Sequence, residues 1–518
     1  MSRHQSLSPQ TAGLLETYDV TIRHFFPDFW KWIDALSEPR KVPGRCQYSQ
    51  RILAGTELLR CLTSLRSHRE MDSIFNGADN KFLANLCRMT GHRARHVPRG
   101  QTINYWLSML STDGLKGILE KMALTLLDGK KLEICREPLE NSLILGADGT
   151  GLISTVRNIG HSTTRHHRDG RCTNHVYVLL VPFLSPDGIV IPFQAEFIEN
   201  GKDYREEFDK QDCEHKAETK LFSRIHDQHP RLPVTMLMDA LSLDYTQMYG
   251  CIEKNWNFVI SYRDGAVKGL AERIGSRLKD GTEIEHKRCC SLKNETKIER
   301  EYTWFKLTYD FGKANEKGNT GFPVTYAKMK VTSTGADGKT TIQTYERITN
   351  FSLSSAHIEC FFEYLGGTRW CEENQGFNEM KNLGLNIEHA YGCQGEAVVN
   401  HFLLQMIAFI IMQLAGKTDL FSKKELIPAK AGDNIDNATV TDGKVCNMPN
   451  AGDDKNKSAV EDDEGCSTWN NKRRKTMREM FSSLSVISLK LLEELTGRIM
   501  EPLEERIVKT LRVRWAYG

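Results

Sequence analysis

Two aspartates each follow a short apolar run, where a side chain can act at the edge of a buried sheet. Asp148 follows Leu143–Ala147 and precedes Gly-Thr-Gly, and Asp239 follows Val234–Met238. Taken alone, Asp148 would be read as a turn aspartate. As a pair, the two acids are expected to converge, because each lies at the end of a strand of the same sheet. Carboxylate oxygens are the ligands that Mg²⁺ prefers, so the pair predicts a divalent-cation site.

A third acid is expected on a helix much later in the chain, between about residues 368 and 384. Residues four apart share one face of a helix, and here they are Arg369, Glu373, Phe377 and Lys381. An acid between two cations suits a site that combines a metal ion with a phosphate. Glu373 is therefore predicted as the third acid, with Glu372, about 100° away, as the second choice. A surface helix with i,i+4 ion pairs is the alternative.

Histidine and cysteine gather in one short segment, which raises the alternative of a zinc site. The segment reads HSTTRHHRDGRCTNH, and these residues are His161, His166, His167, Cys172 and His175. Their spacing matches no pair-plus-pair zinc pattern. Because arginines alternate with them, we favour a basic loop that faces DNA, with contacts from Arg165, His166 and Arg168.

Two further patterns are weaker. Glu196 and Glu199 could supply an alternative acid, but they fit better as the polar end of a strand. Gly338-Lys-Thr340 resembles the end of a phosphate-binding loop. Ser333 occupies the earlier position where such a loop requires glycine, so a hairpin turn is predicted instead.

The N-terminal part of the chain is locally basic. Residues 1–100 hold 15 Lys and Arg against 9 Asp and Glu. Arg93, Arg95 and Arg99 precede an amphipathic stretch that begins near Thr102. A basic loop that leads into a helix is a plausible element for contacts to DNA phosphates. A solvated charged loop is an equally good interpretation of this segment alone.

The elements that would position the acids alternate between strand and helix patterns. Between residues 141 and 262 the order is strand, hairpin, helix, strand, helix, strand. The hairpin is indicated by the turn Ser185-Pro-Asp-Gly188 between two β-rich runs. Such an order predicts an α/β domain with a mixed sheet.

The regions outside this domain differ in composition. We expect helices over 1–140, an antiparallel β insertion over 266–350, and helices again from about residue 355 to 416. The range 421–470 is rich in Asp, Asn, Gly and Lys and predicts a disordered acidic linker. The tail over 471–518 is predicted to be helical and basic, with 11 Lys and Arg against 6 Asp and Glu.

The overall composition excludes several classes of protein. The chain has 518 residues, 26% of them charged, and a formal net charge of +2, so it is neither wholly disordered nor uniformly basic. Its 14 cysteines form no Cys-x-x-Cys pair, and the first residues lack the apolar core of a signal peptide. The most apolar stretch, Phe402–Ala415, is shorter than the ~20 residues that a bilayer requires, so it is predicted to be a buried helix and not a membrane span. We therefore expect a cytoplasmic protein with reduced thiols and no membrane partner.

Several segments resemble bacterial insertion-sequence transposases of the DDE class over roughly residues 40–420. The similar segments are Asp148-Gly-Thr-Gly, EFIEN at 196–200, KQDCEHK at 210–216, Asp239-Ala-Leu, RWCEENQGFNEMKN at 369–382 and EHAY at 388–391. The spacing of the later block differs from the family signature: four residues rather than two separate Tyr364 from Arg369, and seven rather than six separate Glu373 from Lys381.

The resemblance implies a ribonuclease-H-like core divided into 141–265 and 351–420 by the β insertion, with Asp148, Asp239 and Glu373 as catalytic triad and metal ligands. It implies two Mg²⁺ (or Mn²⁺) ions, cleavage at the element's ends and strand transfer into target DNA. Arg369 and Lys381 would hold DNA phosphates, and residues 1–140 would bind the DNA ends.

A homodimer bridging two ends, in the bacterial cytoplasm at the nucleoid, is expected. A metal-dependent nuclease of the same fold, or an inactive or domesticated DNA-binding relative, is the alternative.

Overall fold

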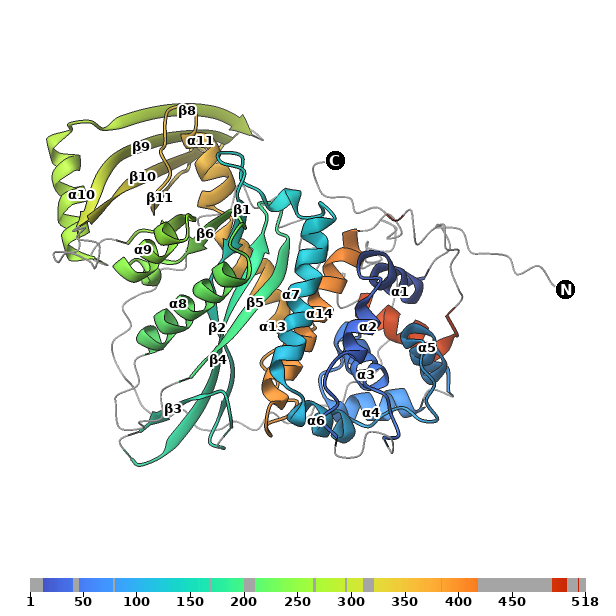
Figure 1. Ribbon diagram of the computed structural model, residues 1–518. Coiled ribbons are helices and arrows are strands. Elements are labelled where there is room, and N and C mark those ends of the chain that lie inside the picture. The colour runs from blue at the N-terminus through green and yellow to red at the C-terminus, as the bar shows by residue number, and fades with distance from the viewer. Residues whose placement is uncertain are drawn as a thin grey trace.

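The structure is a computed structural model that combines a helical region, a long mixed sheet and further helices (Figure 1). It describes residues 13–40, 46–77, 80–157, 159–167, 169–199, 210–263, 267–293, 296–310, 321–382, 384–417, 487–500 and 511. The predicted acidic linker and Arg168 lie outside the described residues, as does most of the basic tail.

The N-terminal region is helical throughout its described part, as the apolar periodicity predicts. Its helices are α1 (Leu14–Phe25), α2 (Phe29–Asp34), α3 (Gln50–Leu62), α4 (His68–Gly77), α5 (Lys81–Thr90), α6 (Gly100–Met109) and α7 (Thr112–Asp128). The start of α3 follows from its sequence, because the Ser49 hydroxyl accepts a hydrogen bond from the backbone N–H of Ile52. The predicted apolar face of α3 is buried.

The central region alternates strands and helices in the predicted order. Its strands are β1 (Leu143–Gly146), β2 (Asp148–Thr155), β3 (Thr163–His166), β4 (Cys172–Leu184), β5 (Val190–Ile198), β6 (Val234–Met238) and β7 (Asn257–Ser261), and its helices are α8 (Lys210–Gln228) and α9 (Tyr245–Glu253). The predicted turn joins β4 to β5, and Gly188 adopts φ 82° there, a conformation that favours glycine.

Strand pairing divides this central sheet into an antiparallel part and a parallel part. β4 pairs antiparallel with β5 on one side and with β1 and β2 on the other, and β1, β6 and β7 are parallel. The core order is therefore β5-β4-β1-β6-β7, with β2 continuing β1 along β4. The fold is α/β with a mixed sheet, as the pattern of elements predicts.

The region that follows extends this same sheet. It contains α10 (Lys268–Asp280), β8 (Glu285–Lys293), β9 (Thr296–Asp310), β10 (Gly321–Thr334) and β11 (Thr340–Thr349). β11 pairs antiparallel with β7, so the insertion and the core form one 11-stranded sheet. The predicted antiparallel strands are present. The sequence did not predict α10, because its two glycines and many charges mask a short apolar face at Leu270 and Ile274, which are buried.

The later helices are less regular than the sequence predicts. They are α11 (Ile358–Phe361), a π-helical segment (Phe362–Gly366), α12 (Arg369–Cys371), a second π-helical segment (Glu372–Phe377), α13 (Asn378–Asn382) and α14 (Ala397–Lys417). A π-helix is bonded from residue i to i+5 and so turns more slowly than an α-helix. The prediction that Glu373 and Phe377 share one face is therefore wrong: Glu373 is exposed and Phe377 is buried.

α14 is the central helix of the molecule. By length and composition its residues Ala397–Gly416 could cross a bilayer, but 94% of the apolar window is buried inside the fold. It packs against β5 and against α3, α6 and α7 (Figure 1). The prediction of a buried core helix at Phe402–Ala415 is confirmed.

Candidate active site

Asp148 and Asp239 lie side by side where two parallel strands end. β1 and β6 are neighbours with Gly146 opposite Leu237, and the Ala147 N–H donates to the Leu237 carbonyl at 3.1 Å. Continuing this register by two residues pairs Asp148 with Asp239, on backbones about 4.8 Å apart. The predicted convergence of the two acids therefore follows directly from strand pairing.

The Asp239 carboxylate is fixed by the turn that follows β6. Asp239 precedes a short 3₁₀ helix (Ala240–Ser242), and its Oδ1 accepts hydrogen bonds from the N–H groups of Leu241 at 2.8 Å and Ser242 at 3.3 Å. One oxygen is thus used to hold the side chain in place. Asp148 accepts a similar bond from the Gly149 N–H at 2.9 Å.

Glu372, the second choice for the third acid, reaches this same edge. Its side chain is fully buried, and its Oε2 lies so close to Gly146 that a Cβ there would be only 2.1 Å away. Glycine at 146 is therefore required for this approach. Among the described residues, neither Glu372 oxygen has a hydrogen-bond partner with normal geometry. The backbone N–H of Asp148 lies close enough to favour the ionised carboxylate.

Glu373, the predicted third acid, is exposed on the second π-helical segment. The geometry therefore favours Glu372 over Glu373 as the partner of Asp148. Arg369, one turn earlier, lies where the sequence predicts a cation: its Nη1 is 3.4 Å from Asp148 Oδ2.

Two further acids reach the site from α8. Glu214 Oε1 would lie 2.1 Å from a Cβ at Gly149, which places its carboxylate beside the backbone that follows Asp148. Glu218, one turn along α8, is buried, and its Oε1 accepts a hydrogen bond from Ser242 at 2.7 Å. Its second oxygen is buried without a partner among the described residues. Neither residue was predicted from the sequence as a site acid, although their i,i+4 spacing was a usable signal.

Burial, together with the neighbouring acids, raises the pKa of several carboxyl groups at this site. Burial raises the pKa of Asp148 to about 7; Arg369 opposes this shift, while Asp239 and Glu214 add to it. Burial likewise raises the pKa of Glu218 to about 8, with Glu214 and Asp239 contributing. For Glu372, burial and the neighbouring Asp148 hold the pKa well above its ordinary value. The ionised forms of these carboxyl groups are therefore disfavoured in the metal-free site, and Arg369 offsets this only in part.

The carboxylates of the site are not drawn together as tightly as the ligands of a bound metal ion. Among the described residues, the one group of three potential ligand atoms that all lie within 4.8 Å is Glu57, His68 and His401, far from these acids in the helical region. The carboxylates of Asp148, Asp239 and Glu372 form no cluster of that tightness.

The described histidines of the proposed zinc segment have separate partners. His161 contacts Glu199 at 2.6 Å and Glu396 at 2.7 Å, His166 contacts Cys172 at 3.1 Å, and His175 contacts Ser154 at 3.1 Å. No zinc-like cluster is present among the residues that the structure describes there.

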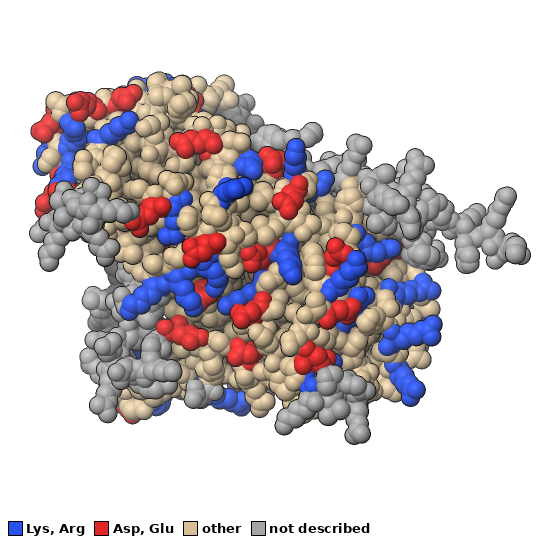
Figure 2. Space-filling view, viewed as in Figure 1, with Lys and Arg blue, Asp and Glu red and all other residues tan. Residues whose placement is uncertain are grey.

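The predicted DNA-binding residues occupy several separate surfaces. Arg165 and His166 are exposed on the β3–β4 hairpin, and Arg93, Arg95 and Arg99 are exposed between α5 and α6. Lys381 forms an ion pair with Glu388 at 3.0 Å. The basic residues of the face drawn in Figure 2 alternate with acidic ones and cross the surface over α8 and α7.

No protein-family model matches this chain, and no curated protein matches it either.

Proposed function

We propose that this chain is a metal-dependent DNA strand-transfer enzyme of the DDE transposase class, with a ribonuclease-H-like core. The core order β5-β4-β1-β6-β7 supports the fold, because three antiparallel strands are followed by two strands parallel to the first. The observation that carries the function is the convergence of Asp148, Asp239 and Glu372 at the carboxyl ends of β1 and β6.

The donor set fits divalent cations that prefer oxygen. The groups at this edge are carboxylates, with no described cysteine or histidine shown contacting the three acids, and such hard donors suit Mg²⁺ or Mn²⁺. Asp148, Asp239 and Glu372 would hold the ions, with Glu214 and Glu218 close behind. Bound ions would stabilise the attacking and leaving oxygens of a phosphodiester substitution.

The remaining residues of the site would orient the DNA. Arg369 is held 3.4 Å from Asp148 and can turn its planar guanidinium to a DNA phosphate once cations neutralise that acid. The Asp239 carboxylate is held in one orientation by two backbone N–H groups, so its second oxygen is available without a change of rotamer. The strand ends thus supply a rigid base on which a scissile phosphate is positioned.

The test is DNA cleavage and joining by the purified full chain. Supercoiled plasmid with Mg²⁺ or Mn²⁺ measures nicking, and a labelled oligonucleotide with a free 3′-OH measures its joining to the plasmid. We expect both products from the wild type, and neither from Asp239→Asn or in EDTA. Nicking without joining would indicate the nuclease alternative. DNA binding with no reaction by the wild type would indicate a binding-only relative.

A further inference from the structure

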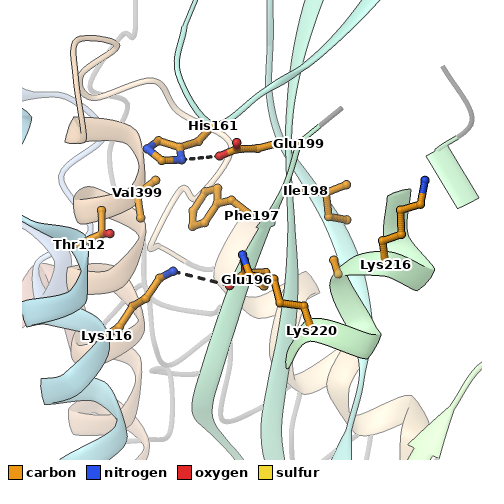
Figure 3. Close-up of a pocket in the computed structure, with 11 residues that line it drawn as sticks. Thr112, Lys116, His161, Glu196, Phe197, Ile198, Glu199, Lys216, Lys220 and Val399 are labelled. Atoms are coloured by element: carbon orange, nitrogen blue, oxygen red, sulfur yellow. Dashed lines mark hydrogen bonds and ion pairs between the residues drawn. The ribbon is translucent and has the colours of Figure 1, made fainter. Parts of the chain in front are cut away.

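A cavity of about 300 Å³ lies beside β5, between α7 and α8 (Figure 3). Its floor is formed by Glu196–Ile198 of β5 and by the next residue, Glu199. The two helices contribute Thr112 and Lys116 on one side and Lys216 and Lys220 on the other. We call Lys116, Lys216 and Lys220 the lysine pocket. Its members come from the helical region and from the core, so the pocket joins the two.

The cations around this cavity outnumber the acid that they share. The Glu196 carboxylate is buried and contacts Lys220, Arg224 Nη1 at 2.7 Å and Lys116 Nζ at 3.7 Å. One buried carboxylate therefore faces three positive charges, and Lys216 lies on the rim. Of the other nearby acids, Asp113 acts electrostatically on Lys116, while Glu199 and Glu396 are directed to His161, as Figure 3 shows for Glu199.

The Lys116 ammonium group is less stable as a cation here than in water. Burial lowers its pKa; Glu196 and Asp113 oppose the shift, and Arg224 and Lys220 add to it. Like charges held together in a partly enclosed space are stabilised by an anion. The cavity is thus electrostatically suited to a phosphate group.

α8 connects this pocket to the candidate active site. Glu214 and Glu218 are four residues apart and face the acid edge, whereas Lys216 and Lys220 are offset by two residues, which is about 200° around a helix. The acids and the lysines therefore lie on opposite sides of a helix about 10 Å across. That width corresponds to about three steps of one DNA strand, at roughly 3.4 Å per step.

We propose that the lysine pocket binds a backbone phosphate of the same DNA strand that lies in the active site. The inference rests on the proposed function for the identity of the substrate. It adds a contact that neither the acids nor the exposed arginines provide, and one that sets where the strand crosses α8. Lys216 and Lys220 act as phosphate ligands, and Lys116 supports them from α7.

The test compares two doubly substituted chains that lose the same charge. Lys216→Gln/Lys220→Gln removes the exposed half of the pocket, while Lys116 and Arg224 still neutralise Glu196, so folding is preserved. Lys121→Gln/Lys279→Gln removes two exposed lysines elsewhere, on α7 and α10. Binding to a short labelled duplex is measured by fluorescence anisotropy in EDTA over a series of salt concentrations.

We expect the pocket variant to bind about tenfold more weakly than the control at moderate salt. The slope of log K against log salt should fall by about one to two, since each lost phosphate contact removes roughly 0.9. Equal affinity and equal slope in the two variants would overturn the proposal. The proposal would also be overturned if inorganic phosphate stabilised the wild type while the pocket variant bound DNA as tightly as the control variant. That result would indicate a site for a free anion.

The two proposals fail separately in these experiments. Binding is measured without metal and does not require cleavage, whereas the proposed function is read from cleavage by the wild type. If the wild type cuts DNA and the pocket variant binds DNA as tightly as the control, only the proposal for the lysine pocket is wrong. If the wild type never cuts DNA but the pocket variant binds it weakly, only the proposed enzymatic function is wrong.

Discussion

Glu372 is a buried acid beside another acid, and this is an unfavourable arrangement unless a cation relieves it. Its carboxylate has no cation within ion-pair distance among the described residues, and Asp148 lies next to it. An isolated buried charge costs several kcal/mol, so a purely structural role would favour an apolar residue at this position. The arrangement is explained if the site is completed by a divalent ion.

Substitution of the two adjacent glutamates separates their roles. Glu372→Gln should reduce metal-dependent cleavage by on the order of 10²–10³-fold, equivalent to several kcal/mol of lost transition-state stabilisation. Glu373→Gln, the exposed control, should stay within about threefold of the wild type. The measurement is the initial rate of plasmid nicking. The opposite ranking would return the catalytic role to Glu373 and contradict the geometry.

The raised pKa values predict how the metal-free protein responds to pH. At Asp148 and Glu218 the folded chain binds more protons than the unfolded chain between pH about 4, where ordinary carboxyls titrate, and about 8. The contribution of these two groups to stability without metal should therefore fall as the pH rises across this window. Glu218→Gln removes one raised group, so it should stabilise the protein at pH 8 more than at pH 5.

Thermal unfolding in EDTA at a series of pH values measures this effect. Mg²⁺ should raise the melting temperature more at pH 8 than at pH 5, because bound cations replace protons at the same carboxylates. The assignment of Glu218 to this site would be contradicted if Glu218→Gln changed the melting temperature by the same amount at pH 5 and at pH 8.

At the residue scale, the sequence predicts the strand-end acids but not the helix acid. Asp148 and Asp239 follow apolar runs, and strand register alone brings them together. The choice between Glu372 and Glu373 depends on the π-helical segment, whose wider turn changes which residue faces the sheet. No periodicity in the residues signals that segment. The packing of Glu372 against Gly146 is a contact between distant parts of the chain.

At the scale of elements, a closed ring of hydrogen bonds joins four helices. Glu57 of α3 is hydrogen-bonded to His401 of α14 at 3.0 Å, and His401 is hydrogen-bonded to Asn104 of α6 at 2.6 Å. Asn104 is hydrogen-bonded to His68 of α4 at 3.1 Å, and His68 to Glu57 at 3.0 Å, which closes the ring. The Arg60 guanidinium completes the cluster and is fully buried. The ring fixes the helical region against the central helix.

Tyr391, the last residue of the segment EHAY at 388–391, contacts members of this cluster. Tyr391 covers the Arg60 guanidinium at 3.7 Å from the ring centroid, and its carbonyl accepts a hydrogen bond from Asn104. Tyr391 therefore helps to join the later part of the core to the helical region. Periodicity predicts α3 and α14 themselves, but it cannot predict a polar ring whose members are up to 344 residues apart.

Removing the one acid of this ring should destabilise the protein strongly. Glu57→Gln leaves Arg60 buried beside a neutral partner, and breaking a buried pair in this way costs about 3–5 kcal/mol. Asp28→Asn, which removes the exposed ion pair with Lys31, is the matched control and should cost about 0–1 kcal/mol. Urea unfolding of both variants measures the difference. Similar costs would show that the ring adds little to the assembly.

At the scale of the whole molecule, a described segment late in the chain contacts the first described helix. The described residues 487–497 are helical and pack against the N-terminal helices (Figure 1). Glu494 accepts hydrogen bonds from the N–H groups of Leu14 and Leu15 at 3.2 and 3.0 Å, at the start of α1, and Arg498 contacts Glu16 at 2.6 Å. A carboxylate at a helix N-terminus is stabilising, so the late segment caps the first helix.

This contact predicts that the late segment stays bound after the chain is cut. A protease site introduced between residues 418 and 486 and then cleaved should leave two fragments that co-elute on size exclusion, because Leu491 and Leu495 are fully buried in the contact. Leu491→Ala should loosen the complex, since truncating a buried leucine costs about 2–5 kcal/mol. Leu489→Ala, in the same segment but 60% exposed, should leave it intact. Fragments of the unsubstituted chain that separate would mean that the N-terminal helices are complete without the end of the chain.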